Sequence, residues 1–320
     1  MIYNQFLFLT KKIVKILKNK SINTDSPHSL IVDTTMLCNN SCYFCWRRQK
    51  PDALKEVNKK YLDSPHMEFS TFKKIVDQAC RIKTMRWLSL CGPMGEPMMH
   101  PEIEKFFAYA HSKNKFKTIV INTNGLAIDK HDIPTLLSSI TEFSISVDSI
   151  DPETYGKIHG SAEFLPKVIE NIKKCIDYKK KNGALAKIIV RFTENELNIG
   201  QYPEFEKFFK ELGVDDINYT KVHSFAGVKK ELASQVTASN CCQPRKVINF
   251  NFKGDLTTCC INWQMSPTFG NINKSSLKKL WMNKSMKQWL NNRLNTEPCK
   301  YCGGLGNHVQ KRNLKDKKSI

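Results

Sequence analysis

The sequence predicts an α/β fold, a partial (β/α)6 barrel of the TIM type, with a smaller C-terminal domain made of a hairpin and a helix. Short β-rich runs alternate with longer helical patterns six times between residues 29 and 221. Such alternation requires a parallel sheet with right-handed crossovers. After about residue 230 this pattern changes, and a chain of 320 residues exceeds what one small core needs. Two unequal domains are therefore expected.

The six predicted strands are short apolar runs, rich in β-branched and aromatic residues, that are bounded by polar or turn-forming residues. They cover residues 29–34, 87–91, 117–122, 142–147, 186–192 and 216–221. Amphipathic helical patterns between them predict helices over 71–83, 102–112, 164–181 and 203–212, with Ser70 as the N-cap of the first. In barrels of this kind the chemistry lies at the C-terminal ends of the strands.

The C-terminal part predicts a hairpin, residues 247–251 and 256–259, that turns at Lys253-Gly254-Asp255, and then a helix from Ser276 to about Leu294. We therefore divide the chain into a basic amphipathic helix over 1–25, the barrel over 26–232, the second domain over 233–308 and a basic tail over 309–320. The first helix is expected to pack on the barrel, with peripheral contact to a membrane surface as the alternative.

The chain carries a net charge of +20 and twelve cysteines. Much of the positive excess is lysine spread along the chain, so a nucleic-acid partner is an open but disfavoured alternative. The N-terminal apolar run is too short and too interrupted by lysine for a signal peptide or a spanning helix. A cytoplasmic location is therefore expected, where thiols stay reduced and metal ligation becomes the leading explanation for so many cysteines.

Three cysteines lie close together directly after the first predicted strand, in the pattern CxxxCxxC: Cys38, Cys42 and Cys45. Three thiolates can hold a [4Fe–4S] cluster and leave the fourth iron open for another ligand. A structural zinc site would usually need a fourth cysteine or histidine nearby. The spacing therefore favours an iron–sulfur cluster.

This motif, with Phe44 just before its third cysteine, resembles the signature of the radical S-adenosylmethionine (SAM) superfamily. The resemblance extends over most of the chain from about Ile31, because further motifs of that superfamily recur in order. It implies a catalytic cluster that binds SAM through the open iron, with Phe44 among the residues around SAM. It names no catalytic acid or base.

Further segments at predicted strand ends are similar to the superfamily's SAM-binding motifs. Gly95 and Glu96 follow the second strand, Asn124 follows the third, and Ser146 and Asp148 end the fourth. The resemblance implies that these residues contact SAM. Taken singly, such short polar residues and the Gly-Glu-Pro turn are also typical of helix caps and ordinary turns.

One departure concerns a position where relatives often have an arginine near the SAM carboxylate. This sequence has His159 in that region, and we expect it to bind SAM differently. Arg191, on the fifth strand, is the alternative cation, although an arginine there is also typical of a structural ion pair.

A second cysteine set lies in the C-terminal domain: Cys241, Cys259, Cys299 and Cys302. A hairpin and a CxxC after a helix can converge into one four-thiolate site, and on spacing alone a zinc ribbon is the alternative. The segment resembles the SPASM domain in its short "twitch" form, which implies one auxiliary [4Fe–4S] cluster. Cys242 and Cys260 are expected substitutes, being adjacent in sequence. Three further cysteines are interpreted as buried apolar residues: Cys80, Cys91 and Cys175.

The resemblance implies an enzyme that cleaves SAM to a 5′-deoxyadenosyl radical, which abstracts hydrogen from the substrate. Relatives with one twitch cluster include enzymes that oxidise an aminocyclitol hydroxyl, so net dehydrogenation of a small, polar, carbohydrate-like substrate is expected. An external one-electron reductant such as flavodoxin or ferredoxin is the expected partner. A peptide-, protein- or RNA-modifying enzyme is the alternative, although only 37 residues precede Cys38. The rival from another class is a non-catalytic zinc- or iron-binding module.

Overall fold

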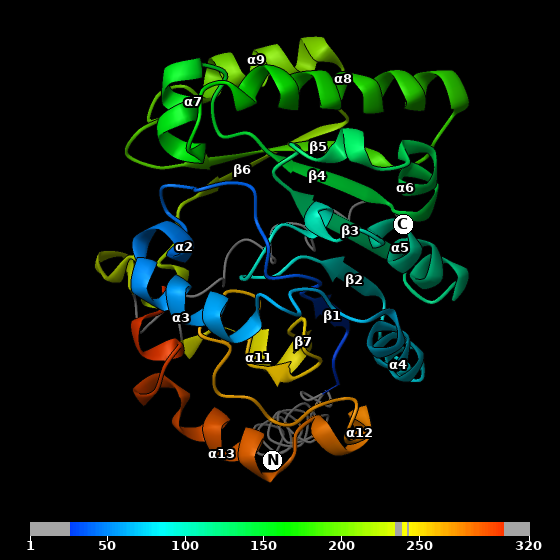
Figure 1. Cartoon of the computed structure of the whole chain (residues 1–320), viewed down its shortest axis with the longest axis vertical. Coiled ribbons are helices and arrows are strands. Elements are labelled where there is room, and N and C mark those ends of the chain that lie inside the picture. Colours follow the sequence, from blue (N-terminus) through cyan, green and yellow to red (C-terminus); the bar gives the residue numbers. More distant parts are fainter. Residues whose placement is uncertain (1–25, 234–238, 242, 304–320) are drawn as a thin grey trace, which may run out of the picture.

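A single eight-stranded sheet forms the centre of the computed structural model, which describes residues 26–233, 239–241 and 243–303 (Figure 1). Its strand order is β6-β5-β4-β3-β2-β1-β7-β8, and every neighbouring pair from β6 to β7 is parallel. The first six strands are β1 Ser29–Val32, β2 Trp87–Leu90, β3 Thr118–Thr123, β4 Glu142–Ser146, β5 Lys187–Glu194 and β6 Asp216–Lys221. The sheet is not closed, so the predicted partial barrel is confirmed.

Helices cover the outside of this sheet (Figure 1). The longer ones are α3 Pro51–Tyr61, α4 Phe69–Cys80, α5 Ile103–Ser112, α6 Ile133–Ser139, α7 Pro152–His159, α8 Phe164–Asn182 and α9 Tyr202–Leu212. In α4 the buried residues Phe72, Ile75, Val76 and Ala79 recur at helical spacing, which explains why this segment forms an amphipathic helix against the core. The four barrel helices predicted from the sequence are confirmed to within a few residues.

The predicted N-cap of α4 is wrong. Glu68 occupies that position, and its carbonyl accepts hydrogen bonds from Thr71 N (3.0 Å) and Phe72 N (3.1 Å). The helix starts earlier than expected because Phe69 packs on Phe106 of α5, with ring centroids 5.5 Å apart. Ser70 therefore lies inside the first turn.

The C-terminal hairpin, β7 Val247–Phe250 and β8 Leu256–Thr257, is confirmed, and it extends the barrel sheet. β7 pairs in parallel with β1, Ser29 opposite Val247. The predicted boundary between residues 232 and 233 therefore does not separate two sheets, and the domain limits stay predictions.

The single helix predicted from Ser276 to about Leu294 is wrong. Two helices occupy this region, α12 Leu277–Leu280 and α13 Lys284–Asn292. Met282 adopts a positive φ of 55°, which breaks the helix. Asn283 then begins the second one, because its side chain accepts a hydrogen bond from Met286 N.

Three predictions fall outside the described residues: the helix over 1–25, the tail over 309–320 and Cys242 as a substitute ligand. Across the ranges that the structure describes, no helix is both long and apolar enough to cross a membrane.

Candidate functional site

The loop that carries Cys38, Cys42 and Cys45 follows β1 and is fixed to the end of α7. Ser41 N donates to His159 O (3.3 Å) and Tyr43 N to Ile158 O (2.7 Å). Within the loop, Cys45 N donates to Cys42 O at 3.0 Å. These backbone bonds hold the loop in a compact turn.

The short helix α2, Trp46–Gln49, ties the other side of this loop to the segment after β2. Trp46 Nε1 donates to Pro93 O at 2.6 Å. Arg47 Nη1 donates to Met36 O (2.8 Å) and to Met94 O (3.1 Å). The cysteine loop and the predicted SAM-binding segment after β2 therefore form one unit.

The three thiols of the loop lie close enough to disfavour one another's ionisation. Burial, followed by the charge of Glu96, raises the pKa of Cys38 to about 12. Burial, followed by Cys45 and Cys38, raises the pKa of Cys42 well above its ordinary value. Iron bound to all three sulfurs would offset this penalty, because a metal favours the thiolate over the thiol. The donor set therefore fits an iron–sulfur cluster.

Gly95 packs directly against the chain that leads into the cysteine loop. A Cβ atom there would lie 2.4 Å from Thr35 O and 2.5 Å from Leu37 O, so no larger residue fits. Glu96 N donates to Leu37 O at 2.7 Å. The backbone at these two positions sets the height of the loop above the sheet.

The Glu96 carboxylate is buried and joins the ends of β2 and β3. It accepts hydrogen bonds from Met98 N (3.1 Å), Thr123 Oγ1 (2.5 Å) and Asn124 N (2.8 Å). Burial nevertheless raises its pKa. Asn124 extends the connection, since its Nδ2 donates to Asn39 Oδ1 in the cysteine loop at 2.7 Å.

Asp148, just after β4, and His159, the last residue of α7, lie beneath the cysteine loop, and each side chain is 1% exposed. His159 Nε2 is 3.0 Å from Val147 O and 3.2 Å from Asp148 Oδ2. Its Nδ1 lies 3.5 Å from Cys42 Sγ. Asp148 Oδ1 accepts a hydrogen bond from Thr193 N at 2.6 Å. The structure thus brings these two predicted residues to the base of the loop, with Ser146 half-buried beside them.

A line of polar side chains crosses the sheet from Arg191 on β5. Arg191 Nη1 donates to Asn122 Oδ1 at 2.8 Å, and Asn122 Nδ2 donates to Ser89 Oγ at 3.3 Å. Ser89 Oγ in turn donates to Cys91 Sγ at 3.2 Å. Cys91 was interpreted from the sequence as a buried apolar residue. In the structure it follows β2 and its sulfur accepts a hydrogen bond.

The second cysteine set converges on one pocket. Its walls contain Cys241, Cys259, Cys299 and Cys302, together with Ala226, Gln243, Pro244, Ile261 and Pro298. Burial, followed by neighbouring cysteines, raises the pKa of Cys259 and of Cys299 to about 12. Among the described side chains, no three potential ligands lie close enough to hold a single metal ion. Four sulfurs around one pocket fit a group with four thiolate ligands.

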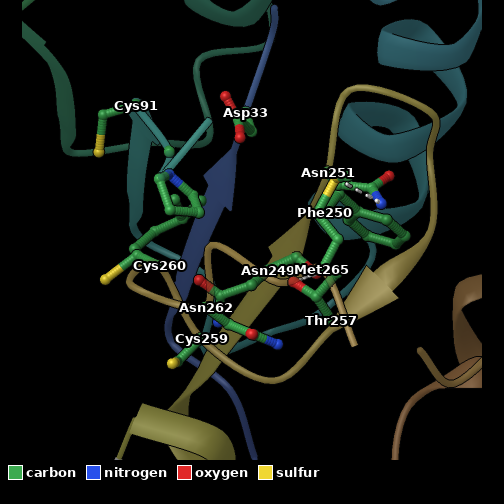
Figure 2. Close-up of a pocket in the computed structure, with 13 residues that line it drawn as sticks. Asp33, Cys91, Asn249, Phe250, Asn251, Thr257, Cys259, Cys260, Asn262 and Met265 are labelled. Carbon is green, nitrogen blue, oxygen red and sulfur yellow. Dashed lines mark hydrogen bonds between the residues drawn. The ribbon is translucent and has the colours of Figure 1, made fainter. Parts of the chain in front are cut away.

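A narrower pocket adjoins this one and lies at the ends of β2, β1 and β7 (Figure 2). Its walls include Asp33, Cys91, Asn249, Asn262, Cys259 and Cys260, and it has room for little more than a water molecule. Cys260, the expected substitute ligand, lines this narrower pocket and not the pocket of the four cysteines. Cys259 lines both pockets. We call this narrower space the central pocket.

Asp33, at the end of β1, was not predicted as a site residue. Its carboxyl is buried, and Oδ2 accepts a hydrogen bond from Met94 N at 3.2 Å. A Cβ atom at Gly92 would lie 2.4 Å from that oxygen, so glycine is required there. Burial raises the pKa of Asp33 well above its ordinary value, although Arg47 opposes the shift. The available signal was a carboxylate near the C-terminal end of the first predicted strand, which is too common to be decisive.

Two aromatic pairs join the cysteine loop to the C-terminal part of the chain. Trp46 stacks on Trp263 with ring centroids 5.3 Å apart, and Phe44 stacks on Phe225 at 5.5 Å. Phe44 therefore has a packing partner of its own beside the loop. The two cysteine sites are held in fixed relation by these contacts.

Comparisons with known proteins agree with this geometry. Residues 32–205 match the Radical SAM superfamily, and residues 241–303 match the iron–sulfur cluster-binding domain SPASM. A probable GTP 3′,8-cyclase of Methanococcus maripaludis is 23% identical over 185 residues, which are 58% of this chain and 56% of the relative. The chain therefore spans little more than half the length of that relative.

Two solved structures have similar folds. Streptococcus suis SuiB bound to the precursor peptide SuiA has a TM-score of 0.64 at 15% identity, over 94% of this chain and 74% of SuiB. BtrN in complex with AdoMet and 2-DOIA has a TM-score of 0.54 at 14% identity, over 87% of this chain and 94% of BtrN. At these identities the likeness shows the fold.

Proposed function

The chain belongs to the radical SAM superfamily, and from that membership we propose that it oxidises a small hydroxyl-bearing substrate by two electrons. It is a radical SAM enzyme that uses SAM and [4Fe–4S] clusters, as its two matched domains imply. When bound, these groups supply the 5′-deoxyadenosyl radical and a one-electron acceptor. The observation that carries the proposal is the position of Cys259 in the walls of both pockets.

We assign the catalytic cluster to Cys38, Cys42 and Cys45. The support is that one compact loop presents the three thiols and that Gly95 and Arg47 fix its position above the sheet. We assign SAM to the strand ends around that loop. The residues proposed to surround it are Phe44, Gly95, Glu96, Asn124, Ser146, Asp148, His159 and Arg191.

Within this set, two residues are proposed to act through the loop. His159, the last residue of α7, contacts Cys42 and the backbone just after β4, and Asp148 supports His159, so both position the cluster ligands. The Glu96 carboxylate accepts a hydrogen bond from Asn124 N and so holds Asn124 at the edge of the loop. Arg191 supplies a cation at the end of the polar line through Asn122.

We assign the auxiliary cluster to Cys241, Cys259, Cys299 and Cys302. A zinc ribbon is the alternative, but a single zinc ion would draw four sulfurs to bonds of about 2.3 Å. Among the described side chains no three potential ligands lie close enough for one metal ion, and the four cysteines instead line one pocket, which supports the larger group.

The two-electron outcome is supported by the nearness of the two proposed cofactor sites. Cys91, which begins the predicted SAM segment, and Cys259, a proposed auxiliary ligand, lie in the walls of the same central pocket. After hydrogen abstraction the substrate must lose one more electron to become a stable oxidised product, and an adjacent cluster is a suitable acceptor. The enzyme also needs an external reductant, for which flavodoxin or ferredoxin is proposed.

The test uses anaerobically reconstituted full-length protein, SAM, dithionite and a panel of cyclitols, aminocyclitols and sugars that includes 2-DOIA, the compound in the BtrN complex. We expect a product two hydrogens lighter for each SAM consumed. The control variant, with Cys38, Cys42 and Cys45 all replaced by Ala, should form no 5′-deoxyadenosine and should retain about four irons per chain. A product that is epimerised or methylated without oxidation refutes the proposal, and so does a panel without any product.

Peptide modification is the second candidate, and the likeness to peptide-bound SuiB favours it. Its distinguishing result would be cross-linked or otherwise modified peptide in place of an oxidised small molecule. An RNA target would use the net charge of +20. A purely structural metal module would leave SAM uncleaved in the same assay.

A further inference from the structure

The outer surface of α12 and α13 carries positive charge that no acidic residue of the same segment balances. Residues 256–296 form the longest stretch of the sequence without an aspartate or a glutamate. The stretch contains six cationic residues: Lys274, Lys278, Lys279, Lys284, Lys287 and Arg293. Positive charge is therefore more concentrated here than in the chain as a whole, where 50 Lys and Arg face 30 Asp and Glu. We call the lysines of the two helices the basic face: Lys278, Lys279, Lys284 and Lys287.

The two helices present these lysines to solvent because their apolar side chains pack inward. Leu277 and Leu280 of α12 are buried, as are Met286 and Leu290 of α13. α12 is attached to the barrel through Leu277 N, which donates to Gln78 Oε1 of α4 at 2.7 Å. All four lysines of the basic face are exposed, and within the described part of the chain none of them forms an ion pair. Their charge is therefore available to a partner.

One end of the basic face borders the proposed auxiliary cluster. α13 is followed directly by the short helix η5, Arg293–Asn295, and the chain then reaches Cys299. Burial raises the pKa of the Cys299 thiol to about 12, and the charge of Arg293 opposes this shift. Arg293 Nη2 also donates to Ser239 O at 2.8 Å, two residues before Cys241. A protein bound to the face would thus lie near two of the four proposed ligands.

The composition of the face distinguishes between classes of negatively charged partner. A helix that binds a membrane surface inserts exposed apolar side chains, whereas the exposed positions of α13 are Lys, Ser, Gln and Asn only. Single-stranded RNA is bound through exposed aromatic rings and arginine, whereas only Arg293 of the six cations is an arginine. Lysines on a polar surface instead suit a transient contact with an acidic protein, which long-range charge attraction guides into place.

We propose that an acidic one-electron carrier protein, of the flavodoxin or ferredoxin class, docks on the basic face and exchanges one electron with the auxiliary cluster. The docking site follows from the charge of the face and from its position beside Cys299. The exchange rests on the proposed function, in which the cluster takes an electron from the substrate and must release it before the next turnover. The reduced cluster loses one electron and the oxidised carrier gains it, and no bond forms or breaks.

The first arm of the test measures docking by calorimetric titration of an acidic flavodoxin into reconstituted full-length protein. The Kd should rise with salt concentration. The face variant carries three substitutions: Lys278→Gln, Lys284→Gln and Lys287→Gln. Its Kd at low salt should be about tenfold higher than that of wild type. The matched control removes the same charge from exposed lysines of α8, at the opposite end of the molecule (Figure 1), and should change the Kd by less than about twofold: Lys173→Gln, Lys180→Gln and Lys181→Gln.

Several results of this arm would overturn the docking site. Equal losses in the two variants would show that only net charge matters, and unchanged binding in the face variant would place the carrier elsewhere. Wild-type protein that binds neither flavodoxin nor ferredoxin also refutes the site. The same proteins are titrated with vesicles of equal parts phosphatidylserine and phosphatidylcholine and with a single-stranded RNA oligonucleotide. If the face variant loses one of these ligands and keeps the carrier, the face belongs to a membrane or to RNA. Iron content verifies folding, and single substitutions replace any triple variant that loses iron.

The second arm measures the exchange in the variant with Cys38, Cys42 and Cys45 all replaced by Ala, which should keep only the auxiliary cluster. This protein is reduced with dithionite, freed of excess reductant and mixed anaerobically with oxidised flavodoxin. The absorbance of the flavin semiquinone should appear, and about tenfold more slowly when the three face substitutions are added. Absence of semiquinone, an unchanged rate, or zinc in place of iron refutes the exchange. Because neither arm contains a substrate, a failure of the proposed oxidation leaves both results valid.

Discussion

The position of the cysteine loop depends directly on Gly95, whose backbone packs closely against the chain that leads into the loop. The two nearest atoms to a Cβ at this position are carbonyl oxygens of the loop approach, at 2.4 and 2.5 Å. Backbone atoms cannot swing away as a flexible side chain can. Any substituent therefore displaces the segment that carries Cys38.

We expect Gly95→Ala to weaken SAM binding by about tenfold or more, which corresponds to about 1.4 kcal/mol. The matched control is Gly183→Ala at the end of α8, where a Cβ meets nothing within 4 Å but φ is +67°. That change should cost about 1 kcal/mol of stability through backbone strain alone. Calorimetric titration of SAM into both reconstituted variants measures the effect, and equal losses in the two would contradict it.

The buried Asp33 carboxyl should make stability depend on pH. Its folded pKa lies above its ordinary 3.8, so between these two values the folded state keeps a proton that the unfolded state has released. The free energy of unfolding should therefore fall as pH rises through this window, by at most about 1.4 kcal/mol per unit. Asp33→Asn should remove that slope and Asp63→Asn should keep it, in anaerobic urea unfolding. A slope that persists in Asp33→Asn assigns it to another group.

At the residue scale, a short spacing in the sequence carries most of the signal for the predicted site. The three cysteines of the loop lie within eight residues, so one turn is enough to bring them together. Asp33, Asn249 and Asn262 have no such spacing. Asp33 and Asn249 come together through the pairing of β1 with β7, in which Asp33 N donates to Phe250 O at 2.9 Å between two strands that are distant in the chain.

At the scale of elements, the barrel strands and helices were predictable because each has its own periodicity. The pairing of β7 with β1 could not be predicted, because the sequence of a hairpin does not indicate which edge of a sheet it will join. The break between α12 and α13 was missed for a local reason: Met282 and Asn283 interrupt an otherwise continuous apolar pattern.

The start of α13 offers a test of that break. Asn283→Ala removes both the acceptor for Met286 N and the donor to Phe269 O, which lies 2.8 Å from Asn283 Nδ2. We expect the free energy of unfolding to fall by about 1–2 kcal/mol. Lys287→Ala, at an exposed position of the same helix, should change it by less than about 0.5 kcal/mol. Denaturant unfolding compares the two, and similar values would show that the cap contributes little.

For the whole molecule, the central fact is that one sheet serves both matched domains. All four residues of β1 are buried, and β7 covers one of its two edges. A barrel made without the C-terminal part would expose that edge along with apolar surface. Such an edge is a template for pairing with other chains.

We therefore expect a chain that ends at residue 240 to aggregate, while a chain that ends at residue 303 stays folded because it keeps every described strand. Size-exclusion chromatography and near-ultraviolet circular dichroism of both proteins are the measurements. A monomeric shorter chain with a cooperative unfolding transition would show that the barrel is independent of β7.

The pairing of β1 with β7 also has a consequence for synthesis. β1 is among the first described elements to leave the ribosome, and its partner β7 emerges only after most of the chain has been made. At about 5–20 residues per second, this interval is on the order of 10–40 s. During that time the cysteine loop is already outside the tunnel, without the Trp263 and Phe225 contacts that later cover it. We therefore expect nascent chains to be open to aggregation until translation reaches the last hairpin.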